Sequence, residues 1–173
     1  MYQRIISLVP SQTELLFDLG LNDRIIGVTK YCIHPPEAQQ KTRVGGTKTL
    51  SIDRILALKP DLILGNIEEN TQAQIEMLRL TQNVVMSDIY TLADALAMIQ
   101  HVGALTGTSE KASEISAKIQ VKFSALRKQK NENKVNPVNP AILSAQENPV
   151  NPAILSEKNQ SCPKKNQSCP KKN

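Results

Sequence analysis

The first 130 residues alternate short apolar runs with longer segments of helical periodicity. Four apolar runs of five residues, IISLV, RIIGV, DLILG and NVVMS, occupy 5–9, 24–28, 61–65 and 83–87. A continuous apolar run of this kind is typical of a strand covered on both faces. Because helical segments separate these runs, the pattern predicts right-handed crossovers and a parallel sheet. We therefore expect an α/β fold, a single doubly wound lobe with about four parallel strands followed by a long helix.

Polar residues and glycines mark where the expected helices begin and end. Ser11 and Glu14 have the spacing of a capping box, in which each side chain bonds the other residue's backbone N–H. Gly20 suits the left-handed position that closes the same helix. Thr91 and Asp94 predict a second cap, ahead of the helical pattern TLADALAMIQHVGALTG. The polar cluster after Pro10 is thus first interpreted as a helix start, with ligand contact as the alternative.

The last helical pattern, residues 109–129, is interpreted as the start of a long amphipathic helix. Its apolar side chains fall near one face of the helix. These residues are Ala112, Ile115, Ile119, Val121, Phe123 and Leu126.

Beyond residue 130 the chain is built from exact repeats. NPVNPAILS occurs at 136–144 and again at 148–156, and KNQSCPK occurs at 158–164 and 165–171. Short repeats rich in Asn-Pro pairs bury too little apolar surface to offset the entropy of ordering. We therefore predict a lobe with the start of its long helix at 1–130, and a disordered low-complexity tail at 131–173. A Cys-Lys tether or metal-binding tail is the alternative.

The charge of the chain is concentrated in this tail. Residues 1–127 carry 13 Lys and Arg against 13 Asp and Glu, whereas 128–173 carry 8 Lys against 3 Glu. The lobe is therefore neutral, and nothing in it favours nucleic-acid binding. The chain has no Trp, 3 Tyr and 2 Phe, so the core is expected to consist of Leu, Ile, Val and Ala.

Several classes of function lack their signatures. IISLV is too short for the apolar part of a signal peptide, and no run approaches the length of a membrane span, so the sequence as written predicts a cytoplasmic chain. None of the nucleophile-elbow, P-loop or dinucleotide-binding motifs is present, and we expect no enzyme. Cys32 and His34 offer two metal ligands where zinc needs three or four, so we interpret His34-Pro35-Pro36 as a rigid turn.

Four motifs together suggest a family. They are SLVPSQTELL at 7–16, GVTKY at 27–31 followed by HPP, RVGG at 43–46, and IDRILALKPDLI at 52–63. In order and spacing they resemble the N-terminal lobe of the cobalamin and iron-siderophore substrate-binding proteins of ABC importers, the cobalamin-binding type most of all. The resemblance implies two doubly wound lobes joined by a rigid helix, a ligand in the cleft between them, an ABC permease as partner and a periplasmic or cell-envelope location. A second lobe needs well over a hundred further residues, where this chain has the repeat tail.

The strand ends supply the expected ligand contacts. In open α/β sheets, ligands lie at the carboxyl ends of the strands, which places Pro10 and Ser11, Tyr31 and Asn66 on one rim. A helix N-terminus there can also bind anionic or carbonyl groups through its free N–H groups. The resemblance implies that the Tyr31 ring packs on the ligand, with a half-buried structural Tyr as the alternative.

The loop Gly45-Gly46-Thr47 is expected beside these residues, so Gly46 and Thr47 complete the predicted site. Thr47 and Asn66 fall where the cobalamin-binding relatives often have Trp. Neither side chain can stack on a corrin face, which counts against cobalamin itself and favours the broader class of metal chelates. Cobalamin or another metal chelate is thus the candidate ligand.

Asp53 matches a position where relatives carry an acidic residue that docks onto arginines of the permease. Its alternative role is a carboxylate stabilised by the dipole of its helix. Three functions remain open: a binding protein for cobalamin or a related chelate, a non-functional fragment that self-associates through its exposed lobe face, and a cytoplasmic flavodoxin-like module that binds a small ligand.

Overall fold

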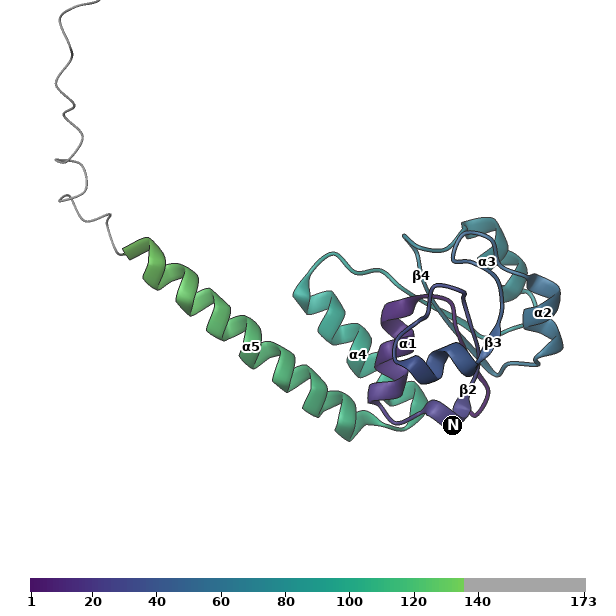
Figure 1. Ribbon diagram of the computed structural model, residues 1–173, viewed down its shortest axis with the longest axis horizontal. Coiled ribbons are helices and arrows are strands. Elements are labelled where there is room, and N and C mark those ends of the chain that lie inside the picture. Colours follow the sequence, from purple (N-terminus) through teal and green to yellow (C-terminus); the bar gives the residue numbers. More distant parts are fainter. Residues whose placement is uncertain (136–173) are drawn as a thin grey trace, which may run out of the picture. The chain divides into compact units, whose positions relative to one another are not determined.

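The computed structural model describes the backbone of residues 1–135 and the side chains of residues 1–130. Its centre is one sheet of five strands in the order β3-β2-β1-β4-β5, and every neighbouring pair is parallel (Figure 1). The strands are β1 Ile5–Ser7, β2 Ile25–Val28, β3 Thr42–Arg43, β4 Leu62–Asn66 and β5 Val84–Ser87. The predicted α/β class and parallel sheet are confirmed.

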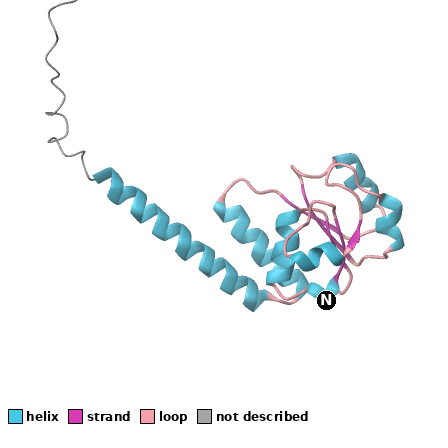
Figure 2. Cartoon of the chain, in the orientation of Figure 1, coloured by secondary structure: helices cyan, strands magenta, loops and turns pink. Residues whose placement is uncertain are grey.

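Helices connect the successive strands and lie on both sides of the sheet (Figure 2). The α-helices are α1 Pro10–Asp18, α2 Ile52–Ala57, α3 Gln72–Arg79, α4 Leu92–Thr106 and α5 Ser109–Val135. Two 3-10 turns, Asn22–Arg24 and Pro36–Gln40, complete the described elements. Met1–Lys130 form one compact unit, referred to below as the lobe. The sequence predicts a disordered tail from residue 131, but the backbone of 131–135 continues α5, so the helix runs past that boundary. From 136 onward the predicted disorder falls on residues outside those described and stays a prediction.

Each face of the sheet has its own apolar core. Successive residues of a strand point to opposite faces, so Ile5 joins the core under α1, α4 and α5, whereas Ile6 joins the core under α2 and α3. Both side chains are fully buried. Burying a side chain of this size contributes about 1.5–3 kcal/mol, which is why the central strands read as unbroken apolar runs.

The strand β3 escaped the sequence pattern because it is short and polar. Thr42 and Arg43 pair with Gly27 and Val28 at the edge of the sheet. The Arg43 guanidinium donates to the carbonyls of Thr29 at 2.8 Å and Cys32 at 3.0 Å, and so ties the strand to the loop after β2. These contacts join segments that are apart in sequence, and no local periodicity signals them.

The predicted capping box at the start of α1 is wrong. The N-cap is Val9, Pro10 begins the helix, and no side chain caps it, so exposed Ser11 lies inside the first turn. A buried pair does the anchoring instead. The Thr13 hydroxyl donates to Ser7 Oγ at 2.8 Å, and Ser7 Oγ donates to the Val9 carbonyl at 3.0 Å. Pro10 displaces the cap because its fixed φ favours the first helical position.

The other two predicted helix boundaries are confirmed. Gly20 has φ +78°, and the N–H groups of Gly20 and Leu21 bond the carbonyls of Phe17 and Leu16 in a Schellman motif. At α4, Thr91 and Asp94 form the predicted capping box. The Asp94 carboxylate accepts hydrogen bonds from the Thr91 hydroxyl and from the amides of Thr91 and Tyr90. These bonds, the one from the Thr91 hydroxyl most of all, hold the pKa of Asp94 below the ordinary value of 3.8.

Only the first half of α5 packs as predicted. Ala112 is fully buried, and Ile115 and Ile119 pack against the core under α1 and α4. Every residue from 121 to 130 is exposed, including Val121, Phe123 and Leu126. Val121 follows Ile119 by two residues and so lies off the buried face, while Phe123 and Leu126 belong to the part of the helix that the lobe core does not cover.

The substitution Thr13→Val tests the buried hydroxyl pair. Valine keeps the shape of threonine but leaves Ser7 Oγ without its donor, so we expect the free energy of unfolding to fall by about 1–3 kcal/mol. The matched control, Ser11→Ala, removes an exposed hydroxyl that caps nothing and is expected to change stability by less than about 0.5 kcal/mol. Urea unfolding followed by circular dichroism measures both. A larger loss for Ser11→Ala would restore the capping-box interpretation.

Candidate functional site

The loops after all five parallel strands meet at one edge of the sheet, called the rim below. Pro10 and Ser11 form the first turn of α1 and enter the rim directly after β1. Tyr31 lies in the loop after β2, and Asn66 is the last residue of β4. The structure therefore places these predicted residues at strand ends that share one edge. Whether they hold a ligand remains a prediction.

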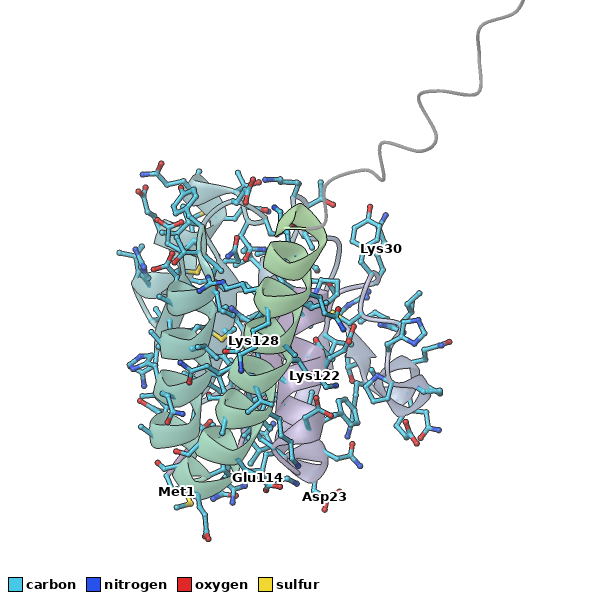
Figure 3. All side chains as sticks on the ribbon, turned by 90° about the vertical axis from the view of Figure 1, so that its left-hand side faces the viewer. Met1, Asp23, Lys30, Glu114, Lys122 and Lys128 are labelled. Atoms are coloured by element: carbon cyan, nitrogen blue, oxygen red, sulfur yellow. The ribbon has the colours of Figure 1, made fainter. Side chains whose placement is uncertain are left out.

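Tyr31 and Lys30 form an accessible part of the rim. The Tyr31 ring is 52% exposed, and the Lys30 ammonium lies 5.1 Å from the centre of the ring. Lys30 projects from the surface of the lobe (Figure 3). A β-carbon built on Gly46 would lie 3.3 Å from Lys30 Cε and 3.4 Å from Tyr31 Cε2, so the bare glycine lets its loop lie against the pair. The site thus offers a cation and the edge of an aromatic face.

The predicted residues Thr47 and Asn66 build the loops rather than project from them. Thr47 is only 8% exposed, and its carbonyl accepts from Asn70 Nδ2 at 3.0 Å. Asn66 Oδ1 accepts from the amides of Glu68 and Glu69, at 2.9 and 3.2 Å. Its Nδ2 donates to Ser87 Oγ at 3.2 Å. These bonds occupy the polar atoms of Asn66, so its contribution to the site is to hold the loop after β4 in shape.

Asn70 is a site-building residue that the sequence analysis missed. Its side chain accepts from the Asn66 amide at 2.9 Å and donates to the Thr47 carbonyl, and so joins the loops after β3 and β4. Two further bonds join the same loops, from Thr71 Oγ1 to the Lys48 carbonyl and from Lys48 Nζ to the Glu68 carbonyl. The run Glu68-Glu69-Asn70-Thr71 between a strand and a helix was the available signal, because Asn and Thr favour loop bonds of this kind.

Gln12 is the second residue that was missed. It is buried in the first turn of α1, and its Nε2 donates to the Gly65 carbonyl at 2.9 Å and to Ser87 Oγ at 2.7 Å. It therefore ties α1 to the ends of β4 and β5. Gln12 also lines a cavity of about 280 Å³ between β5 and α4, together with Val85, Met86, Asp88, Met98 and His101, among others.

Acidic groups gather where β4 and β5 end. The Asp88 carboxylate, by its charge and by a hydrogen bond, raises the pKa of Tyr90 above the ordinary 10.0, and Glu68 adds to this from the neighbouring loop. Glu68 and Glu69 are exposed at the same edge. Asp53 is also exposed, in the first turn of α2, which begins where the loop after β3 ends. The rim thus carries carboxylates on both sides of the Lys30 and Tyr31 pair.

The Cys32 and His34 pair does not converge. Cys32 is buried, with Sγ 3.2 Å from Thr29 Oγ1, whereas His34 is exposed. Within residues 1–130, no three His, Cys, Asp or Glu side chains lie together as a metal site would require.

The comparisons with known proteins agree with the fold. The family described as "Periplasmic binding protein" matches residues 5–153. The chain belongs to this family. The match covers the lobe and the long helix, and so confirms the resemblance that the four sequence motifs carried.

Two relatives of the periplasmic binding protein family are named for vitamin B12. The chain is 34% identical over 126 residues to the vitamin B12-binding protein of Pectobacterium carotovorum subsp. carotovorum, covering 72% of this chain and 46% of that protein. It is similar to the crystal structure of the periplasmic vitamin B12-binding protein BtuF of Vibrio cholerae, with 31% identity and a TM-score of 0.69 over 74% of this chain and 51% of that one.

The fold is shared more widely than the B12-binding proteins. The periplasmic heme-binding protein RhuT from Roseiflexus matches with a TM-score of 0.69 at 24% identity, over 79% of this chain and 53% of that one, and shows the fold alone. The chain thus spans about half the length of the relatives it matches. Among the described residues, no helix combines the length and apolar character that a bilayer crossing requires.

The substitution Asn70→Ala tests whether this side chain holds the rim together. It leaves the Asn66 amide and the Thr47 carbonyl without partners, so we expect a loss of about 1–3 kcal/mol in stability. Hydrogen exchange of the amides at 45–50 should also accelerate, because the loop loses its tie to the end of β4. Gln72→Ala, an exposed change at the start of the next helix, is the control and should leave both unchanged. Equal effects of the two substitutions would contradict the assigned role.

Proposed function

We propose that the chain is one lobe of a substrate-binding component of an ABC uptake system for cobalamin or a related metal chelate. Membership of the periplasmic binding protein family and the names of the relatives support the class of protein. Those relatives are named as binding proteins, which favours binding over catalysis. The names of these relatives also favour a location in the cell envelope, whereas the sequence alone predicts the cytoplasm.

The observation that carries the proposal is the Tyr31 and Lys30 pair on the rim. A half-exposed ring at a strand end has an apolar face and a polar tip, which suits a large amphipathic macrocycle. The adjacent ammonium lies 5.1 Å from the ring and suits carboxylate or phosphate groups on the ligand's periphery. The first amides of α1, at Ser11 and Gln12, lack partners within the helix and add donors for carbonyl groups.

The ligand class is broader than cobalamin. Thr47 is buried, and the Asn66 side chain is bonded to its own loop and to Ser87 at the end of β5, so neither offers a stacking surface. The rim therefore presents the Tyr31 ring with polar groups around it, and the exposed Tyr90 ring after β5. Such a surface is compatible with a corrin, a porphyrin or an iron-siderophore complex, and cobalamin is the first ligand to test because the relatives above are named for it.

A single rim buries one side of a ligand, so the affinity expected of this chain is modest. The matched relatives are about twice as long, which fits a cleft with a second wall. Two alternatives follow from the same geometry. One is a fragment without binding activity, whose rim self-associates because no ligand or second lobe shields it from water. The other is a small-ligand module of flavodoxin-like architecture, which purification with a bound nucleotide would reveal.

Titration of the full chain with cobalamin tests the function. We expect saturable binding, followed by Tyr fluorescence and cobalamin absorbance, that weakens by roughly tenfold or more in Tyr31→Ala because the ring is the main apolar contact. Tyr90→Ala removes the same fluorophore from the end of β5 and is expected to bind like the unchanged chain. Binding absent up to about millimolar ligand, the floor for a specific contact, would sink the proposal. Equal weakening in both variants would move the site away from Tyr31.

We also propose that Asp53 contributes to docking on an ABC permease. Asp53 is exposed at the start of α2, on the rim side of the sheet, and belongs to no salt bridge among the described residues. An exposed carboxylate can approach an arginine of a partner without first breaking an internal bond. Exposed Glu68 and Glu69 lie at the same edge and extend the acidic surface.

Charge reversal tests the docking proposal. Asp53→Arg should weaken co-sedimentation with a vitamin B12 importer permease in nanodiscs, and more so at low salt, because like charges would then meet. Asp23→Arg makes the same change at the opposite end of β2 from Lys30, as the two labelled side chains show (Figure 3). This control should bind normally. An equal loss in both variants would indicate a net-charge effect and no specific contact.

A further inference from the structure

The outer edge of β5 is open. The amide of Ile63 donates to the Asn83 carbonyl at 2.8 Å, and the amide of Ile67 donates to the Ser87 carbonyl at 3.0 Å. Parallel strands bond through alternate residues, so Asn83, Val85 and Ser87 face β4. Val84 and Met86 therefore direct their N–H and C=O groups away from the sheet. No hydrogen bond among residues 1–130 uses these four groups.

The strand carries none of the usual devices that block an open edge. Exposed edges are commonly protected by proline, lysine, a bulge or extreme shortness. The opposite edge strand, β3, has only two residues, whereas β5 reads Val-Val-Met-Ser in regular register with β4. Two β-branched residues and no charge make this edge a good template for another strand.

Space for side chains lies on both sides of this edge. The cavity of about 280 Å³ on the α4 side is lined by Val85, Met86 and Met98, among others. A second cavity, of about 340 Å³ on the α3 side, is lined by Met86, Ile75 and Ile67, among others. Successive side chains of an added strand would point alternately into these two spaces.

The sequence around β5 is complementary to itself about Val85. In an antiparallel pair centred on this residue, the outward-facing Val84 of one copy lies opposite Met86 of the other, and the two Val85 side chains face each other. Asp88 comes opposite Gln82, so no like charges meet. Four backbone hydrogen bonds would form between groups that have no partner in the lobe.

Exposed apolar side chains flank the edge with the same symmetry. Leu80, at the end of α3, is 84% exposed, and Tyr90, after β5, is 81% exposed. They stand five residues before and five residues after Val85. A two-fold axis at Val85 therefore brings Leu80 of each copy to the same end of the pair as Tyr90 of the other. Both contacts would bury apolar surface that the single lobe leaves in water.

We propose that β5 is the interface of a homodimer, in which two copies of this chain pair their β5 strands antiparallel about Val85 and form one continuous ten-stranded sheet. This interface uses the edge of the sheet and leaves Tyr31 free. It therefore stands or falls independently of chelate binding, and it differs from association through the rim.

Proline at position 84 tests the backbone pairing. Because the Val84 amide faces outward, Val84→Pro deletes a dimer hydrogen bond from each copy and spares the bonds to β4. Sedimentation of the full chain should show a species of twice the 19.1 kDa chain mass, and the variant should weaken dimerisation by roughly tenfold or more. Val84→Thr keeps the amide and is the matched control. A chain that stays monomeric, or a dimer that Val84→Pro leaves intact, overturns the proposal.

A cross-link tests the register and does not depend on the proline variant folding. With Cys162 and Cys169 replaced by Ser, Val85→Cys should form a covalent dimer on mild oxidation, because the two residues at the axis are directly opposite. Leu80→Cys, at an exposed position away from the axis, should form little covalent dimer.

A charge exchange tests the flanking contacts. Leu80→Asp should weaken the dimer, and adding Tyr90→Lys should restore it through new opposite charges. Equal cross-linking at both positions, or no rescue, would contradict the two-fold at Val85.

Discussion

Burial of the central strands on both faces is the constraint on which this structure depends. Ile5, Ile6, Leu62 and Ile63 are fully buried, and their side chains divide between two cores on opposite sides of one sheet. Parallel strands with two covered faces require a helix on each side, so the chain winds in both directions from β1. The order β3-β2-β1-β4-β5 is the result, and it places the loops after all five strands at one edge.

That edge has little apolar core of its own, and its shape comes from polar bonds between loops. Asn70 and Gln12 each bond backbone groups of other loops or strand ends, and Asn66 bonds the amides of its own loop and Ser87 Oγ at the end of β5. These side chains are used inside the rim, whereas the Tyr31 ring, with Lys30 beside it, is accessible at its surface. The chain spans about half the length of the relatives it matches.

The same architecture leaves specific surfaces without cover. The sheet ends on one side at the two-residue strand β3 and on the other at the open strand β5. Helix α5 packs through Ala112, Ile115 and Ile119, but its residues from 121 to 130 are exposed. Lys122 and Lys128 lie on this exposed part of the helix (Figure 3). Apolar side chains and backbone groups on these surfaces have no partner within the described lobe.

The sequence by itself determined the parallel α/β sheet, four of its strands, the Gly20 and Thr91 helix boundaries and the family, because these depend on local periodicity, backbone preference and the order of short motifs. It also located the rim, since strand ends can be read from the apolar runs. Only the tertiary structure decided that Pro10 displaces Ser11 as the start of α1, that β3 exists, and that Thr47 and Asn66 are used inside the loops. The strand β3 and the burial of Thr47 depend on contacts between segments far apart in the chain, of which a local pattern carries no record. The start of α1 depends instead on a competition between two local preferences, which the fixed φ of Pro10 wins.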